Sequence, residues 1–228
     1  MNDSTSPQNS SSKEDIVTAE DVISYLRTKI RNGHVVPGQR LVEADIMRET
    51  QASRGRVRSA LQRLQADGFV VIEEYRGASV KRHSREEVLQ LYNVREVLEG
   101  LAARTVAAGA DPEVMQKLEE LQNKMNACQD EGNNRDFADF NEEWHSLIIS
   151  ASKNGYIGEF MDRLRVPTFR LQFKMFYEDK VVLEANEDHR LVTKAILEGN
   201  AEEAEAQMRL HVRNAFNNLN KMGDEFFA

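Results

Sequence analysis

Cysteine, long apolar runs and an excess of positive charge are all scarce or missing in this 228-residue sequence. A single cysteine, Cys128, excludes an intrachain disulfide and a zinc site built on several thiolates. No stretch reaches the ~18 apolar residues that a membrane helix needs, so no membrane partner is expected. Residues 1–13 lack the basic and apolar regions of a secretory signal, and their polar, serine-rich composition predicts a disordered tail. The chain is therefore expected to be cytoplasmic.

The net charge of −8 argues at first against a nucleic-acid partner, but the charges are unevenly distributed. Residues 13–83 carry 13 Lys/Arg and 10 Asp/Glu, whereas residues 84–228 carry 17 and 27. Within the first part, one stretch combines a single acid, Glu49, with five arginines: Arg48, Arg54, Arg56, Arg58 and Arg63. A mildly basic module on an acidic body is compatible with DNA binding, because only the docking face has to attract phosphates. On charge alone, a solvated helix face is the commoner explanation.

Residues 14–83 show the order helix, short helix, helix and β-hairpin. Apolar spacing and turn residues predict a helix over 18–32 that is capped by Thr18. A short second helix includes Leu41, Ile46 and Met47, and a third helix runs from its N-cap Ser53 to Asp67. Two strands are predicted over 69–72 and 78–81. The hydroxyl of Ser53 is expected to accept a free backbone amide of the third helix. This order is typical of a winged helix-turn-helix, in which the hairpin is the wing.

From residue 84 onward the sequence contains no convincing strand and no internal repeat. Six helices are predicted there, over residues 85–108, 112–130, 134–152, 155–179, 181–198 and 201–221. The predicted fold class is therefore mainly α, with an N-terminal winged helix-turn-helix over 14–83 and an all-α six-helix bundle over 84–228.

Three of the five histidines occupy inward faces of these predicted helices: His145, His189 and His211. An isolated histidine on an apolar face is usually a core residue with a hydrogen-bond partner of its own. Three buried imidazoles in one bundle would be costly unless each had a partner, and one shared divalent cation would satisfy all three. Zinc suits three imidazoles best, and nickel, manganese and iron are alternatives. A zinc-dependent hydrolase is thus the alternative function, although Glu142 and Glu143 lie on other faces and supply no paired general base.

Motifs along the chain match a known family in order and spacing. The N-terminal motifs are Ile30 with Gly33, Pro37 to Leu41, Ser53 to Leu64, Asp67-Gly68 and Arg76-Gly77. The C-terminal motifs are Tyr92, Val94-Arg95, Leu98-Glu99, Phe140-Asn141, Trp144-His145, Ala151 with Asn154, His189-Arg190 and His211. In this combination the sequence resembles the GntR superfamily of transcription regulators, in the FadR-like branch with an FCD-type ligand-binding domain. Six helices in place of seven put it nearer the VanR-like subgroup.

The resemblance implies a homodimer that binds an inverted-repeat operator in double-stranded DNA. It assigns DNA contacts to the third helix and the wing tip, at Ser53, Arg54, Gly55, Arg56, Arg58, Arg76 and Gly77. A guanidinium suits this role because it can bond O6 and N7 of a guanine together, or clamp a phosphate. Two departures affect the choice of operator. Ala44 stands where many relatives carry an arginine, and Glu73 and Glu74 in the wing should repel phosphates.

The resemblance also implies a metal ion held by one aspartate and three histidines, at positions occupied here by Asn141, His145, His189 and His211. A neutral amide in place of the carboxylate should hold the cation less tightly and leave it more positive toward an incoming acid. Arg95 matches a position that binds, together with the metal, the carboxylate of a small organic acid. The alternative for Arg95 is an ion pair with Glu99 one helical turn away.

The predicted function is a metabolite-responsive, DNA-binding transcription regulator that acts as a repressor and not as an enzyme. A DNA-binding architectural protein without a ligand is a third interpretation, but it leaves the inward histidines unexplained.

Overall fold

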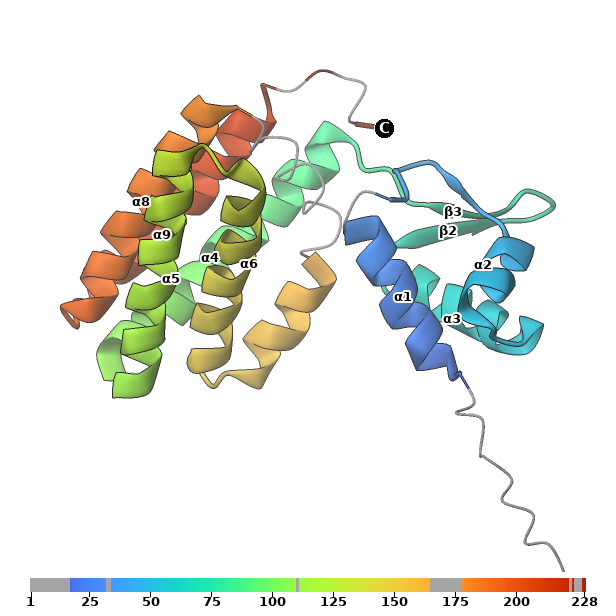
Figure 1. Cartoon of the computed structure of the whole chain (residues 1–228), viewed down its shortest axis with the longest axis horizontal. Coiled ribbons are helices and arrows are strands. Elements are labelled where there is room, and N and C mark those ends of the chain that lie inside the picture. The colour runs from blue at the N-terminus through green and yellow to red at the C-terminus, as the bar shows by residue number, and fades with distance from the viewer. Residues whose placement is uncertain (1–16, 32–33, 110, 165–177, 222, 224–226) are drawn as a thin grey trace, which may run out of the picture.

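The computed structural model describes residues 17–31, 34–109, 111–164, 178–221, 223 and 227–228. The described chain is mainly helical with one small sheet, which confirms the predicted fold class (Figure 1). Its buried apolar residues form two separate clusters, one between Val22 and Val80 and the other between Val88 and Phe227. No helix among these residues is both long and apolar enough to cross a membrane. The expected tail over 1–13 lies outside the described residues.

The N-terminal cluster is built from three helices and three short strands: α1 (Ala19–Arg31), β1 (Arg40–Leu41), α2 (Glu43–Thr50), α3 (Arg54–Ala66), β2 (Val70–Glu73) and β3 (Gly77–Val80). A reciprocal cap begins α1. The Thr18 hydroxyl accepts the Asp21 amide at 3.2 Å, and the Asp21 carboxylate accepts the Thr18 amide at 2.7 Å. The predicted helix and its cap are therefore confirmed as far as Arg31. After α3 and its C-cap Asp67, the chain turns toward β2 at Gly68, which adopts a φ of 82°.

Two local predictions in this part were wrong. Leu41 lies in β1, where it pairs with Ala78 of β3, and not in the second helix. A two-residue strand is too short to produce an alternating pattern, so the apolar Leu41 could be assigned to the helix that follows. Ser53 does stand at the N-cap position of α3 in an extended conformation, but its hydroxyl makes no capping hydrogen bond.

The second cluster holds α4 (Arg85–Gly109), α5 (Pro112–Glu131), α6 (Asn134–Ala151), a helical stretch over 155–164, α8 (Asp179–Leu197) and α9 (Ala201–Leu219). Side-chain caps begin five of these helices, at Ser84, Asp111, Asn133, Asn154 and Asn200. The predicted fourth helix over 155–179 was wrong at its end. Residues 165–177 lie outside the described part, and Asp179 already belongs to α8 with Glu178 as its N-cap. No strong breaker marks that junction in the sequence.

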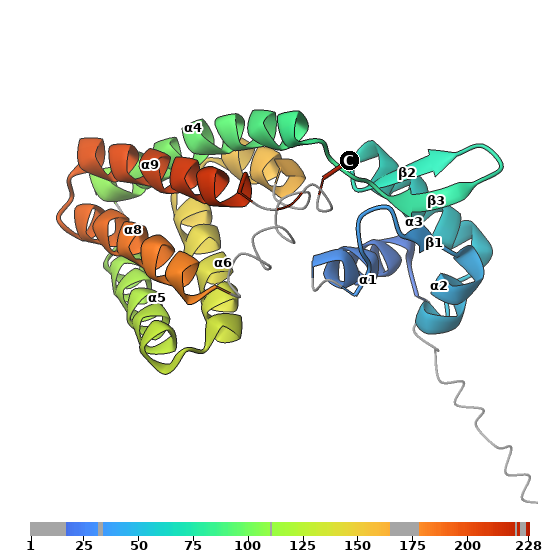
Figure 2. The ribbon, with the colours of Figure 1, turned by 90° about the horizontal axis from the view of Figure 1, so that it is seen from above.

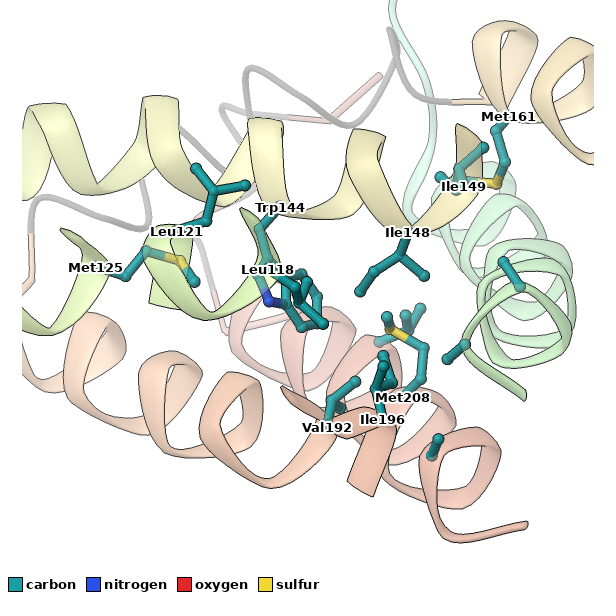
Figure 3. Packing of buried hydrophobic residues seen from close by; sticks show 14 of the residues in the cluster. Leu118, Leu121, Met125, Trp144, Ile148, Ile149, Met161, Val192, Ile196 and Met208 are labelled. Carbon is teal, nitrogen blue, oxygen red and sulfur yellow. The ribbon is translucent and has the colours of Figure 1, made fainter. Parts of the chain in front are cut away.

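Buried side chains of α6, α8 and α9 meet in the middle of the bundle. Figure 3 shows Trp144 and Ile148 pointing inward from α6, with Val192, Ile196 and Met208 on the facing helices. The indole Nε1 of Trp144 donates to Thr193 Oγ1 at 3.0 Å, so its polar atom is satisfied inside the core. The histidines of these three helices adjoin this core.

Helices α4 and α9 run side by side (Figure 2), and a glycine permits their close approach. A Cβ at Gly100 would lie only 2.6 Å from Cγ of Arg209. Phe227 and Ala228 lie against the segment that joins the two clusters. Phe227 is buried with the Arg85 guanidinium 4.1 Å above its ring, and the Ala228 amide donates to the His83 carbonyl at 2.9 Å. The helical part thus begins and ends at one place.

Candidate functional site

The first candidate site is the N-terminal half of α3. One face of this helix is anchored in the core by Val57, Ala60, Leu61 and Leu64. Arg54 and Arg58 project from one flank of this helix, and their side chains are 68% and 61% exposed. Nothing lies within 4 Å of the point that a Cβ of Gly55 would occupy, so another molecule can approach the backbone there. Ser53, Gly55 and these two arginines are therefore exposed next to the positive end of the helix dipole. Arg56, which was also predicted to contact DNA, lies on the other flank of α3 and is half-buried.

A carboxylate on α2, Glu43, was missed in the sequence. The Nε of Arg58 donates to its Oε1 at 2.9 Å, and the Nε of Arg54 lies 3.4 Å from its Oε2. Glu43 thus holds both guanidinium groups on the same side of α3. Because 11 and 15 residues separate Glu43 from these arginines, no helical spacing marks the contact in the sequence.

The wing loop between β2 and β3 projects at the end of the molecule away from the helical bundle (Figures 1 and 2). Arg76 and Gly77 lie there as predicted, with Arg76 3.5 Å from Glu73 and Gly77 at a φ of 83°. Tyr75 beside them was missed. It is 96% exposed at a φ of 63°, a conformation that costs a non-glycine residue roughly 1–2 kcal/mol. A glycine or asparagine at this position would have given a signal in the sequence, but a tyrosine gives none.

The second candidate site is a cluster of three buried histidines: His145 from α6, His189 from α8 and His211 from α9. One ring nitrogen from each lies within 4.8 Å of the other two, and the Nε2 atoms of His145 and His211 are 3.2 Å apart. Neither ring nitrogen of His189 has a hydrogen-bond partner among the described residues. Two polar atoms without partners in a buried ring are unusual, because each carries a desolvation cost. The cluster therefore has the arrangement of a ligand set.

Burial keeps two of these imidazoles, those of His145 and His189, neutral. It lowers the pKa of His145 to about 4, against the opposing effect of the nearby Glu99 carboxylate. Burial also lowers the pKa of His189 well below its ordinary value, and the neighbouring rings of His211 and His145 lower it further. At neutral pH both rings are in the unprotonated form that can ligate a metal ion.

Two carboxylates lie behind the cluster, and the sequence interpretation assigned them no role in it. The Nδ1 atom of His145 is 2.6 Å from Oε2 of Glu99, and the Nδ1 atom of His211 is 3.6 Å from Oδ2 of Asp188. Metal-binding histidines commonly donate a hydrogen bond from their second ring N–H to such a carboxylate, and this bond fixes the tautomer. In both rings this leaves Nε2 facing the middle of the cluster. The contacts join different helices, so no local pattern predicts them.

The donor set fits a divalent metal ion. Two imidazole nitrogens bound to one tetrahedral zinc ion would be about 3.4 Å apart, and the observed pair is separated by 3.2 Å. Asn141 is buried one turn before His145 on α6 and lines the same pocket of about 480 Å³, together with His145 and His211. Three of the four side chains predicted as ligands thus line one cavity, and the fourth, His189, is buried beside His145 and His211.

Arg95, which was predicted to bind the effector, is not among the residues that line the pocket. It is 3% exposed, and its Nε and terminal nitrogen both lie 2.9 Å from Oε1 of Glu99. The alternative ion pair with Glu99 is therefore present, and the same carboxylate also contacts His145. A role in effector binding stays a prediction.

Comparisons with known proteins cover both parts of the chain. Residues 18–80 match the family model described as bacterial regulatory proteins, gntR family, and residues 90–214 match that of the FCD domain. The HTH-type transcriptional regulator LutR of Bacillus subtilis is 28% identical over 206 residues, which are 81% of this chain and 93% of LutR. The HTH-type transcriptional repressor GlaR of Escherichia coli is 25% identical over 205 residues, 86% of this chain and 93% of GlaR.

Among solved structures, E. coli McbR/YncC superposes with a TM-score of 0.79 at 18% identity, covering 90% of this chain and 98% of that one. A putative regulator from Rhodococcus reaches 0.75 at 24% identity with the same coverage. At these identities the likeness shows the shared fold.

Proposed function

Since the chain belongs to the FCD-domain branch of the GntR family of bacterial transcription regulators, we propose that it is a repressor whose operator binding responds to a metal ion and a small carboxylic acid. In this proposal residues 14–83 bind DNA, and residues 84–228 bind the effector and form a homodimer. The observation that carries it is the cluster of three buried imidazoles beside a pocket, in a chain that also presents an arginine-bearing helix. The alternative of a zinc-dependent hydrolase is not supported, because the matched family and the relatives are transcription regulators.

We propose that His145, His189, His211 and Asn141 hold the cation, with zinc as the best fit to three imidazoles. A bound cation would supply a Lewis-acidic charge that attracts a carboxylate. The pocket offers further donors at its rim in the amides of Asn214 and Asn218 and the ammonium of Lys221. Glu184, Glu187 and Asp188 line the same pocket, so its wall is acidic apart from Lys221. A small acid that reaches the cation is therefore favoured over a large polyanion.

The test of this function uses metal-free protein. Zn²⁺ is titrated first, and a panel of small mono- and dicarboxylic acids is then screened by thermal shift with and without Zn²⁺. We expect one Zn²⁺ per chain and at least one acid that raises the melting temperature only in its presence. Absence of Zn²⁺ binding, or equal acid shifts with and without metal, would contradict the proposal.

Asn141→Asp should tighten metal binding by on the order of tenfold, because a charged carboxylate replaces a neutral amide one turn from His145. Competition with a chromophoric chelator measures the affinity. Asn217→Asp is the matched control, since it adds the same charge to the lining of the same pocket on another helix. Equal affinities in Asn141→Asp and the unchanged protein would show that Asn141 is not a ligand.

Arg54→Ala and Arg58→Ala are each expected to weaken specific DNA binding by ~1–3 kcal/mol, the usual loss for a bidentate base contact. Gel-shift titration at fixed salt, on a duplex selected by the protein from a random pool, measures the change. Arg63→Ala is the control, because this exposed arginine pairs with Asp67 at the far end of α3. Unchanged affinity in both variants would remove α3 from the DNA interface.

An exposed apolar stripe on α4 supports the proposed homodimer. Val94, Val97 and Leu101 follow helical spacing and are all exposed in the single chain. Val97→Glu should shift the sedimentation equilibrium strongly toward monomer by placing a charge in that contact. Leu183→Glu, at an exposed position on α8, should leave the dimer intact. A monomeric unchanged protein, or a Val97→Glu dimer, would exclude this interface.

A further inference from the structure

A groove of about 770 Å³ lies between α3 and the wing. Its lining brings together Arg58 and Gln62 of α3, Arg40 of β1, and Tyr75 and Gly77 of the wing. Two carboxylates line it as well, those of Glu43 at the start of α2 and Glu73 at the end of β2. Arg40 and Arg58 contribute guanidinium groups, and Tyr75 contributes the exposed aromatic ring of the wing tip. The family comparison assigns no role to Arg40 or Tyr75.

Duplex DNA fits the position of this groove. The major groove of B-DNA is wide enough for a helix, and a single sugar–phosphate strand separates it from the neighbouring minor groove. If α3 occupies the major groove and the wing reaches the adjacent minor groove, that strand must pass between them. The space between α3 and the wing is the groove described here. Its two carboxylates are already paired with arginines, Glu43 with Arg54 and Arg58 and Glu73 with Arg76, so they do not neutralise the Arg40 guanidinium.

Arg40 has the properties of a phosphate ligand. Its backbone pairs with Ser79 of β3, which fixes its place beside the wing. Its guanidinium extends over Gly77, where one terminal nitrogen lies 3.8 Å from the point that a Cβ would occupy. Arg54 and Arg58 share the Glu43 carboxylate, whereas Arg40 has no ion-pair partner among the residues that the structure describes. Its charge is therefore available to an external anion.

The backbone of Tyr75 is strained, and its exposed ring makes little contact with the rest of the protein that would offset this strain. Its ring is almost fully exposed, and its φ of 63° lies in the left-handed region that a glycine would occupy at lower cost. Glu73 and Glu74 precede it, so the loop cannot rely on charge alone to approach DNA. A neutral ring with a hydroxyl donor can lie against a deoxyribose and bond a phosphate oxygen without that repulsion.

We propose that this groove holds one sugar–phosphate strand of the operator, with Arg40 bound to a phosphate and Tyr75 packed against the sugar on the minor-groove side. The inference rests on the proposed binding of DNA through α3. It adds a contact that recognises the shape and charge of the strand and no particular base.

Arg40→Ala tests the phosphate contact. We expect a loss of about tenfold on both the selected duplex and a scrambled duplex, with a decrease of about 1 in the slope of log affinity against log salt. Arg58→Ala should instead reduce binding of the selected duplex more than that of the scrambled one. Arg63→Ala, which removes the same charge outside the groove, should change neither slope nor affinity by a comparable amount.

Tyr75→Gly tests the ring. We expect threefold to tenfold weaker binding while the melting temperature of the free protein is unchanged or higher, because the left-handed strain is removed. A purely structural tyrosine would lower both quantities together. Tyr75→Phe separates the two contacts, since it keeps the ring and should recover most of the affinity.

The outcomes distinguish the two proposals. An unchanged protein that binds no duplex, or binds it equally with Arg54 and Arg58 replaced, overturns DNA binding through α3. If that binding is present but Arg40→Ala and Tyr75→Gly match the unchanged protein in affinity and salt slope, the groove is not the path of the strand.

Discussion

Replacing His189 and His211 together by alanine is expected to weaken Zn²⁺ binding by at least about a hundredfold. The change removes two of three imidazole nitrogens that lie within 4.8 Å of one another and leaves His145 with a neutral amide. Equilibrium dialysis gives the metal content of the variant, and chelator competition gives its affinity. DNA affinity should remain within about threefold, because α3 and the wing belong to the other core cluster.

His34→Ala is the control for this experiment, since His34 is exposed and lies in the N-terminal part. Circular dichroism must show that the double variant keeps its helicity, because both rings are buried. If a folded double variant still binds one Zn²⁺ per chain, the three histidines are not the metal site and only pack in the core. In that case the search for the metal would move to other parts of the chain.

Glu99→Ala is expected to destabilise the helical part by ~3–5 kcal/mol, the usual result of breaking a buried ion pair from one side. The Glu99 carboxylate contacts two nitrogens of Arg95 at 2.9 Å and lies 2.6 Å from the His145 ring, and both partners are buried. Its removal leaves a buried guanidinium without that anion and an imidazole without that acceptor. Urea denaturation followed by circular dichroism measures the free energy of unfolding.

Glu96→Ala on the same helix is the matched control. Its carboxylate also contacts two arginines, Arg209 and Arg213, but both are substantially exposed. Surface pairs contribute little, so the control should cost no more than about 1 kcal/mol. Equal small losses in the two variants would mean that the Arg95–Glu99–His145 contacts do not stabilise the core. Glu99→Ala should also weaken Zn²⁺ binding by ~10–100-fold, because it releases the orientation of His145.

Much of this architecture follows from local sequence signals. Caps such as Thr18, Asp111 and Asn200 mark helix starts, and apolar spacing identifies the inward face of each helix. That spacing alone placed His145, His189 and His211 on inward faces, and the structure brings the three rings together. Periodicity predicts orientation well because each helix has to bury one stripe.

The missed features depend on how elements pack. Glu99 and Asp188 reach the histidines only because their helices lie beside α6 and α9, and Glu43 reaches α3 across a turn. Strand β1 is too short to have a periodic pattern, and its pairing with β3 is what identifies it. Tyr75 gives no sign of its left-handed backbone, since tyrosine is not a turn residue. In each case the structure depends on packing between elements, which a pattern over a few neighbouring residues does not reveal.

The return of Phe227 and Ala228 to His83 and Arg85 has a consequence for protein engineering. A unit whose entry and exit are adjacent can be inserted into a surface loop of another protein without stretching either end. Residues 84–228 meet this condition, because a host loop would have to open only by the distance between two neighbouring backbones. If the histidine pocket binds a ligand as proposed, such a graft would place that pocket inside the host and make its occupancy detectable through the activity of the host.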